Sequence, residues 1–225
     1  MQRLAKAISN AGICSRRDAE GLIIAGKVKV DGSVALSPAI NVNDDNQIEV
    51  SGKLINRQQP TRLWIYYKPV GLITTHKDPF ARKTVFEELV NLPRVISVGR
   101  LDLNSEGLLL LTNNGDLARQ FELPTNKIKR VYKVRAYGNP KSLLNSNYRN
   151  IKINGIYYNP ESIKLIQEGT TNSWFEVVLT EGKNREIRKI FEYFSLKVNR
   201  LIRTGYGEYV LGDLKAGEYT EVKAK

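Results

Sequence analysis

The sequence predicts an α+β protein in two parts: a small N-terminal module over residues 1–50 and a larger domain over 61–225, joined by a linker over 51–60. Three patterns support this division. Two helix-like stretches and a hairpin signal fill the first part, polar residues with Gly52 and Pro60 fill the linker, and many short strand-like stretches with few helices fill the rest. Such a run of strands is typical of a mixed, mainly antiparallel sheet.

The small module has the pattern of two helices followed by short strands. Apolar side chains at helical spacing predict a first helix near residues 4–8. Ser15, with an acidic residue three positions later, predicts the start of a second helix, because its hydroxyl can accept a hydrogen bond from a free backbone N–H. An Asp-Gly pair predicts a hairpin over 28–34, and a last short strand is expected near 47–50.

The larger domain opens with a strand over residues 62–67, which is rich in aromatic side chains and ends in the turn Lys68-Pro69-Val70-Gly71. The polar and basic segment 74–83 follows, and we expect it to be an exposed loop. Thr84 begins a capping-box pattern and predicts a short helix that ends before Pro93.

The most informative stretch is a charged loop between two apolar strands, at residues 95–98 and 108–111. Asp102 lies in this loop, and Arg100 is two residues before it. A carboxylate so close to buried strands must be paired, lie near solvent or have a shifted pKa, and each condition is common where a carboxylate does chemistry. A purely structural ion pair between Arg100 and Asp102 is the alternative.

The C-terminal half alternates strands with few helices. The expected elements are a helix capped by Asp116, a basic strand at 127–137, a hairpin turning at Asn154-Gly155 and strands at 162–167 and 173–180. After them, Ile187, Ile190 and Phe191 have the spacing of a helix that packs on the core, and three basic residues lie among them.

Composition favours a polyanionic partner. The 35 Lys and Arg residues exceed the 23 Asp and Glu residues, which gives a net charge of +12 at pH 7. Such a charge is typical of nucleic-acid binding. No segment approaches the roughly 20 apolar residues that span a bilayer, and the N-terminus lacks the apolar core of a signal peptide. We therefore expect no membrane partner and a cytoplasmic protein.

Cofactor and metal motifs are missing from the sequence. Cys14 is the only cysteine and His76 the only histidine, so they cannot form a zinc cluster or an intramolecular disulfide. Neither a phosphate-binding glycine loop nor a dinucleotide fingerprint is present. We expect Cys14 to be a packing residue, His76 a loop residue, and the protein to use no metal and no cofactor.

The loop Gly99-Arg100-Leu101-Asp102, followed by Gly107-Leu108-Leu109, resembles the signature of the pseudouridine synthases, in the branch that modifies ribosomal RNA and carries an S4-like RNA-binding domain. Three more segments carry the resemblance: Tyr67-Lys68-Pro69-Val70-Gly71, Lys-x-Tyr-x-Val around Tyr132, and Gly182 to Arg188. The resemblance implies an enzyme that isomerises a specific uridine in ribosomal RNA without a cofactor. It favours the RNA of the large ribosomal subunit over that of the small subunit as the substrate. The base would be flipped out of its stack.

The resemblance also implies roles for single residues. It assigns catalysis to Asp102, Tyr132 and Arg188, with Arg188 placed against the Asp102 carboxylate, to which its planar guanidinium would bind with two hydrogen bonds. It assigns substrate binding to Arg100, Leu201, Lys133 and Arg185. Asp102 would either add covalently to the ribose or the base, or abstract a ribose proton. Without the resemblance, Tyr132 would be read as a core or cross-strand aromatic residue.

The small module resembles the S4-like domain, which lays its helical pair against the phosphates of structured RNA. The resemblance assigns RNA binding to Lys6, Arg16, Arg17 and Lys27. For any one of them, a position on a solvated helix face without RNA contact is equally compatible with the sequence. The implied partner is ribosomal RNA, as a structured stem-loop or a pre-ribosomal particle, bound by a monomer. Two alternatives stay open: a non-catalytic RNA-binding or ribosome-assembly protein, and an enzyme that isomerises uridine in transfer RNA.

Overall fold

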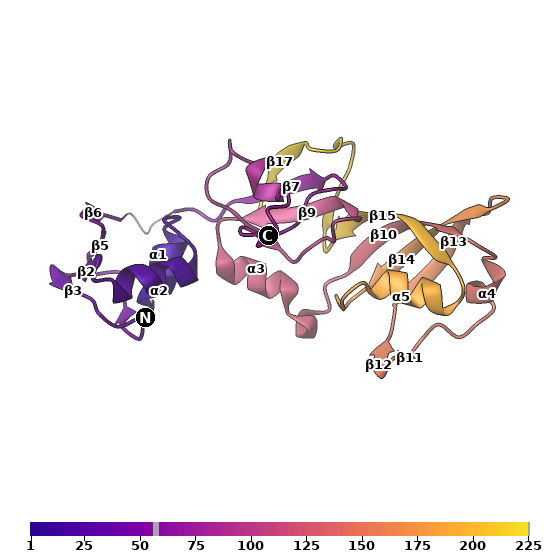
Figure 1. Cartoon of the computed structure of the whole chain (residues 1–225), viewed down its shortest axis with the longest axis horizontal. Helices are drawn as coiled ribbons and strands as arrows, with labels where there is room; N and C mark the ends of the chain where they lie inside the picture. Colours follow the sequence, from indigo (N-terminus) through magenta and orange to yellow (C-terminus); the bar gives the residue numbers. More distant parts are fainter. Residues whose placement is uncertain (56–58, 225) are drawn as a thin grey trace.

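The computed structural model describes residues 1–55 and 59–224 (Figure 1). The N-terminal module lies at one end of an elongated molecule, and the larger domain extends away from it. Residues 56–58 of the predicted linker lie outside the described residues.

The N-terminal module packs two helices against short strands around one apolar core. Its elements are β1 (Gln2–Arg3), α1 (Leu4–Asn10), α2 (Arg16–Ile24), β2 (Val28–Val30), β3 (Ser33–Val34), β4 (Asn41–Val42), β5 (Ile48–Val50) and β6 (Lys53–Leu54). The predicted cap of α2 is confirmed, because the Ser15 hydroxyl accepts a hydrogen bond from the Asp18 N–H at 3.1 Å. The predicted hairpin turn is also confirmed, with φ of 49° at Asp31 and 80° at Gly32.

The small sheet extends further along the chain than the predicted boundary at residue 50. Strand β6 pairs with β5, with Leu54 opposite Glu49, and Ile55 is part of the module's core. Residues 53–55 therefore belong to the small module and not to the linker. Strand β6 has only two residues, too few to show the alternation by which a strand is recognised in a sequence.

The larger domain is built on a nine-stranded sheet with the order β13-β14-β10-β15-β9-β7-β17, to which β8 and β16 add at the side. Its strands are β7 (Leu63–Lys68), β8 (Ile96–Val98), β9 (Glu106–Thr112), β10 (Arg130–Tyr137), β13 (Ser162–Gln167), β14 (Asn172–Leu179), β15 (Lys197–Tyr206), β16 (Tyr209–Val210) and β17 (Tyr219–Val222). Only the central pair β9 and β15 is parallel among the paired strands of the described sheet, so the predicted mixed, mainly antiparallel class is confirmed.

Few helices accompany this sheet. They are α3 (Gly115–Glu122), α4 (Lys141–Leu144), α5 (Glu186–Tyr193) and the 3₁₀ turns η1 (Val85–Glu87) and η2 (Pro124–Asn126), and a separate hairpin joins β11 (Ile151–Ile153) to β12 (Ile156–Tyr158). The capping box of Thr84 and Glu87 is present, but it begins only a 3₁₀ turn. Helix α3 is capped by Asn114, which accepts from the N–H of Asp116 and of Leu117, so the predicted cap by Asp116 is wrong.

The helices divide between the two faces of the sheet, and each face has its own core. Helix α5 covers strands β10, β14 and β15 on one face (Figure 1), and its Phe191 ring meets Phe175 edge to face at 5.1 Å. Helix α3 lies on the other face over β8 and β9, where Phe121 packs near Tyr206. Strands β7 and β9 are buried on both faces, because their alternate residues belong to the two different cores.

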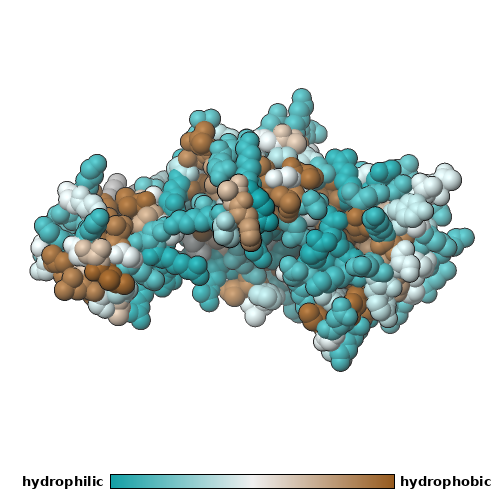
Figure 2. Space-filling view, viewed as in Figure 1, coloured by the Kyte–Doolittle hydropathy of each residue, from teal (hydrophilic) through white to brown (hydrophobic). Residues whose placement is uncertain are grey.

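Exposed surface in Figure 2 is largely hydrophilic, with hydrophobic areas that include one on the N-terminal module. Exposed apolar residues of that module include Ile24, Val34 and Leu36. Within the described ranges, none of the helices has both the length and the apolar character needed to cross a membrane.

Among the described residues, two ion pairs join the modules. Lys6 Nζ of α1 lies 2.8 Å from Asp116 Oδ2 of α3, and Lys77 Nζ lies 2.8 Å from Asp18 Oδ1 of α2. The hydrogen bond from Lys77, helped by one from Ser15, lowers the pKa of Asp18 to about 2. Both pairs are accessible to solvent, which screens their charges, so neither contributes much to the stability of the fold.

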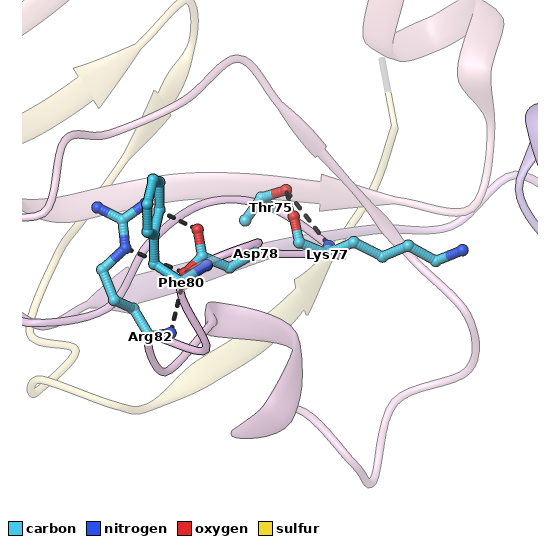
Figure 3. Close-up of polar contacts among 5 residues, drawn as sticks. All are labelled: Thr75, Lys77, Asp78, Phe80 and Arg82. Carbon is cyan, nitrogen blue, oxygen red and sulfur yellow. Dashed lines mark hydrogen bonds and ion pairs between the residues drawn. The ribbon is translucent and has the colours of Figure 1, made fainter.

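Lys77 belongs to the exposed loop 75–82, which Asp78 holds in shape (Figure 3). The Asp78 carboxylate accepts hydrogen bonds from the N–H groups of Phe80 and Arg82 and binds the Arg82 guanidinium with both oxygens. Arg82 in turn lies 5.1 Å from the centre of the Phe80 ring. The predicted exposure of segment 74–83 is confirmed over most of its length, with Phe80 76% exposed, but Thr74 at its start is buried.

Candidate active site

The loop between β8 and β9 is held by contacts on both sides of Asp102. The Gly99 N–H donates to Glu122 Oε1 at 2.6 Å, and the Thr74 hydroxyl both accepts from the Leu101 N–H and donates to the Leu101 carbonyl. Beyond the aspartate, the Ser105 N–H closes a turn onto the Asp102 carbonyl at 3.0 Å. The backbone around Asp102 is therefore fixed by neighbouring elements.

Lys68, at the end of β7, is fully buried beneath this loop. Its ammonium donates to the carbonyls of Pro69 and Ser105, each at 2.8 Å. Burial lowers the pKa of Lys68 to about 8, while the charges of Asp102 and Glu106 oppose that shift. The ammonium forms no ion pair within 4.0 Å among the described residues, so it holds the loop through backbone oxygens.

Gly107 lets β9 approach β15 at the end of the loop. Its φ is +104°, and a Cβ atom placed there would lie 2.3 Å from the Arg203 carbonyl oxygen and 2.8 Å from the Arg203 nitrogen. No side chain fits at that separation. The glycine after the aspartate thus brings the basic strand β15 against the Asp102 loop.

An open pocket of about 420 Å³ lies in front of the loop. Its walls come from the β8–β9 loop, the start of β10, the segment 182–187 and the middle of β15. Five of the residues predicted for the site line it together: Arg100, Asp102, Tyr132, Arg185 and Leu201. A cavity of this size is within the range of small-molecule and nucleoside-sized sites.

The Asp102 carboxylate is half-buried at the pocket wall. It accepts no hydrogen bond and forms no ion pair with any residue in the part of the chain that the structure describes. Tyr132 and Leu201 are 9% and 7% exposed, and both also belong to the apolar core. The pocket therefore offers one unengaged carboxylate between an aromatic and an aliphatic wall.

Basic side chains dominate the rest of the lining: Arg100, Arg130, Lys183, Arg185 and Arg203. Arg130 and Arg203 are almost fully buried and lie 4.9 Å and 5.1 Å from the centre of the Tyr206 ring. Arg203 also donates from Nε to the Leu108 carbonyl at 2.7 Å, and its buried Nη2 finds no partner among the described residues. Such a set of cations suits a phosphate group at the pocket.

Sequence reasoning missed Arg130 and Arg203. Both lie on strands at positions whose side chains point to the interior, and Arg203 is opposite Tyr132 in the ladder between β10 and β15. A charged residue at a buried strand position is rare unless it is paired or functional. The alternation of β10 was a usable signal for Arg130, but β15 was not predicted as a strand.

Glu186 is a buried acid at the rim of the pocket, with Glu181 as its neighbour. Burial, together with the nearby Glu181, raises the pKa of Glu186 to about 8. Lys183 binds Glu181 through its ammonium and donates its backbone N–H to Glu186 Oε2 at 3.1 Å. At neutral pH the Glu186 carboxyl is therefore largely protonated and adds little negative charge to the pocket.

Arg188 is placed differently from the expectation that it binds the Asp102 carboxylate directly. Its guanidinium donates to the Asn104 carbonyl at 2.7 Å and to the Val198 carbonyl at 3.1 Å, and it is not among the residues that line the pocket with Asp102. Burial lowers the pKa of Arg188, and the charge of Asp102 opposes that shift. Arg188 thus fixes the loop two residues after the aspartate.

Lys133, which is expected to bind substrate, does not line this pocket. Successive residues of a strand point to opposite faces, so Lys133 faces away from Tyr132. Its ammonium lies 5.0 Å from the centre of the Trp174 ring, on the side of the sheet that α5 does not cover.

The four basic residues predicted on the N-terminal module do not form one cluster. Arg16 and Arg17 are exposed at the first turn of α2, and Lys27 is exposed beyond its other end, about 13 Å away along the helix axis. Lys6 is engaged in the ion pair with Asp116 described above. Cys14 packs against the core of the module, and burial raises the pKa of its thiol.

Comparison with known proteins agrees with both parts of the chain. The RNA pseudouridylate synthase family matches residues 62–193, and the S4 domain family matches residues 2–48. A protein of Rickettsia prowazekii (strain Madrid E) named as an RNA pseudouridine synthase is 71% identical over 225 residues, which is all of this chain and 96% of the relative.

More distant relatives agree. The ribosomal large subunit pseudouridine synthase B of Salmonella typhi is 39% identical over 234 aligned residues, covering 98% of this chain and 79% of that protein. The crystal structure of a pseudouridylate synthase superposes with a TM-score of 0.65 at 22% identity, covering 99% of this chain and 96% of the other, and it shares the fold. The chain is therefore a member of the RNA pseudouridine synthase family with an N-terminal S4 domain, an isomerase of uridine in RNA.

Proposed function

We propose that this enzyme converts a specific uridine of ribosomal RNA, in the large subunit, to pseudouridine with Asp102 as its essential catalytic residue. The observation that carries the proposal is the unengaged Asp102 carboxylate in a pocket that also contains Tyr132, Leu201 and several arginines. The choice of the large ribosomal subunit rests on the name of the Salmonella relative.

The reaction rearranges atoms without net gain or loss. The bond from ribose C1′ to N1 of uracil breaks, the base turns, and C1′ bonds to C5, while C5 loses its proton and N1 gains one. Asp102 faces the site of bond breaking, Tyr132 stacks on the uracil and assists removal of the C5 proton, and Leu201 forms the apolar wall. Because the step is an isomerisation, these residues need no cofactor to balance it.

The target base must leave its stack to reach the pocket, which costs about a few kcal/mol. Contacts between phosphates and the basic lining offset this cost. Arg100 is exposed at the rim of the pocket, two residues from Asp102, and in this proposal it fills the place that the base vacates. Arg185, at the start of α5 with φ of 51°, binds the flanking phosphate.

Two further residues position the catalytic loop in this proposal. Lys68 holds the Ser105 carbonyl from beneath, and Arg188 holds the Asn104 carbonyl from the side. Both are positively charged and electrostatically coupled to Asp102. They fix the backbone on the C-terminal side of Asp102 without a direct contact to its carboxylate.

The N-terminal module guides the RNA. Arg16, Arg17 and Lys27 are exposed and available to phosphates, whereas Lys6 joins the module to the larger domain through Asp116. The partner is a structured stem-loop or a pre-ribosomal particle, bound by a monomer. The salt dependence of RNA affinity would report these contacts, because each phosphate that the protein neutralises releases counterions.

The test compares Asp102→Asn and Asp102→Ala with a matched control, Asp213→Asn, which makes the same change at an exposed aspartate. Each purified protein is incubated with a ribosomal RNA fragment, and both pseudouridine formation and RNA affinity are measured. We expect product to be lost in both Asp102 variants, with affinity retained, and full activity in the control. Turnover by either Asp102 variant would refute the catalytic assignment, and wild-type protein that binds RNA without product would favour a non-catalytic role.

A further inference from the structure

We infer that the sheet face opposite the pocket is a second RNA-binding surface, which takes a single-stranded segment of the same ribosomal RNA. We call it the outer sheet face and define it by Lys133, Arg135, Lys164 and Trp174 of strands β10, β13 and β14. This inference rests on the proposal that the substrate is a large RNA, because a second segment must be available.

The outer sheet face is uncovered. The alternate residues of the same strands, such as Val134, Ile163 and Phe175, are buried in the core beneath α5. Helix α3 packs over β8 and β9 instead, at the other half of the sheet. Lys133, Arg135 and Lys164 are exposed and Trp174 is half-buried, so a broad part of the sheet is open to a ligand.

Charge and aromatic character on this face match RNA. The strand ladder places Arg135 directly opposite Trp174, and Glu176 lies between Lys133 and Lys164. In the part of the chain that the structure describes, none of the three cations is in an ion pair with a carboxylate, and the Lys133 ammonium lies over the Trp174 ring instead. Single-stranded RNA is bound by this combination, in which bases stack on aromatic side chains and cations follow the backbone.

The segment that enters the pocket cannot be the one that covers this face. Tyr132 lines the pocket, and its neighbour Lys133 points to the opposite side of the same strand. A short stem-loop docked at Asp102 would leave Trp174 uncovered. The outer sheet face therefore adds affinity and selectivity for a large RNA and not for a minimal substrate.

Trp174 provides a direct probe of this surface. The chain has two tryptophans, and Trp64 is only 2% exposed, so a change in fluorescence on RNA binding reports chiefly on Trp174. The ligand is an oligoadenylate of about eight nucleotides, which fits the size of known single-strand sites. It contains no uridine, so it has no base for the pocket to modify.

We expect the oligoadenylate to quench the fluorescence of the wild-type protein, with no quenching in Trp174→Phe. Trp174→Ala should weaken binding about five- to hundredfold, as for loss of one stacked base. Charge reversal by Arg135→Glu with Lys164→Glu should weaken binding and reduce the salt slope by about 1.4, for two lost phosphate contacts. The matched control reverses two exposed lysines elsewhere, Lys141 and Lys215, and should bind as the wild type does.

Measuring pseudouridine formation on a small and on a large substrate tests this inference independently of the proposed function. On a minimal stem-loop, Arg135→Glu with Lys164→Glu should convert uridine at the wild-type rate, while on a ribosomal particle its KM should rise. Equal weakening by the matched control, or quenching that persists in Trp174→Phe, would overturn the inference and leave the catalytic proposal intact. If oligoadenylate quenches the fluorescence but the wild-type protein forms no pseudouridine, the inference about the outer sheet face stands and the catalytic proposal is refuted.

Discussion

Replacing Lys68 by Met should disable the active-site loop while leaving the fold largely stable. The substitution keeps the length of the buried stem and removes the ammonium that binds the carbonyls of Pro69 and Ser105. Hydrogen bonds from a charged donor contribute about 1.5–3 kcal/mol each. Against this, the fall in the pKa of Lys68 from 10.5 to about 8 corresponds to about 3 kcal/mol that opposes the charged form in the fold.

The two hydrogen bonds together contribute about 3–6 kcal/mol and the opposing term is about 3 kcal/mol, so we expect Lys68→Met to lower the free energy of unfolding at pH 7 by at most about 3 kcal/mol. The Ser105 carbonyl, however, loses the donor that fixes the turn after Asp102. A displacement of about 1 Å at a catalytic group lowers turnover on the order of 100-fold. Pseudouridine formation should fall to that extent, while RNA affinity stays as in the wild type.

The pH dependence of stability checks the electrostatic part of this reasoning. The pKa of Lys68 is lower in the folded chain, so between about 8 and 10.5 the unfolded chain binds more protons. The stability of the wild type should therefore rise with pH relative to Lys68→Met across that interval, measured by urea unfolding, with Lys141→Met as the exposed control. A difference that does not change with pH, or a variant with full activity, would refute the role given to Lys68.

Three further substitutions test neighbouring parts of the account. Gly107→Ala should lower the free energy of unfolding by about 2–6 kcal/mol, since its Cβ would overlap the β15 backbone, whereas the control Gly115→Ala in α3 should be neutral or stabilising in thermal unfolding. Glu186→Gln should gain stability relative to the wild type as pH rises from 4.5 to about 8, because the Glu186 carboxyl keeps its proton in the folded wild type over that interval. A difference between the urea midpoints of variant and wild type that is the same at pH 5 and at pH 8.5 would contradict this. Asn114→Ala should lower the stability of the protein by about 1 kcal/mol through loss of the α3 cap, and a thermal midpoint equal to that of the wild type would contradict it.

Local signals in the sequence predicted local structure well. The Ser15 cap, the Asp-Gly and Asn-Gly hairpins and the loop around Asp102 all depend on residues close to one another in the chain. The predicted capping box of Thr84 is present with both of its hydrogen bonds. However, too few helix-forming residues follow it before Pro93, so only a 3₁₀ turn forms. Chemistry within a few residues decides these features.

Long-range pairing was the part that local reasoning missed. Strand β15 lies at the centre of the sheet between β10 and β9, yet its first residues are polar and basic and hide the alternation. Without β15, neither the buried Arg203 nor its place opposite Tyr132 could be predicted. The parallel pairing with β9 also depends on Gly107, whose need for close approach shows only in three dimensions.

The Lys133 and Arg188 predictions show two different limits. Lys133 follows Tyr132 in a strand, and the two-residue period of strands alone places the two side chains on opposite faces. The sequence therefore sufficed to place Lys133 outside the pocket that Tyr132 lines, while its role in substrate binding stays a prediction. For Arg188, the resemblance gave the correct neighbourhood but not the contact, because the distance to the Asp102 loop is set by how α5 packs on the sheet.

The most direct test of the central claim is a map of pseudouridine in ribosomal RNA from cells with and without this gene, restored with wild type or with Asp102→Ala. We predict that one large-subunit position loses its pseudouridine without the gene and regains it only with the wild type. Restoration by Asp102→Ala would contradict the catalytic role of the carboxylate, and an unchanged map at every ribosomal position would contradict the assignment of ribosomal RNA as the substrate.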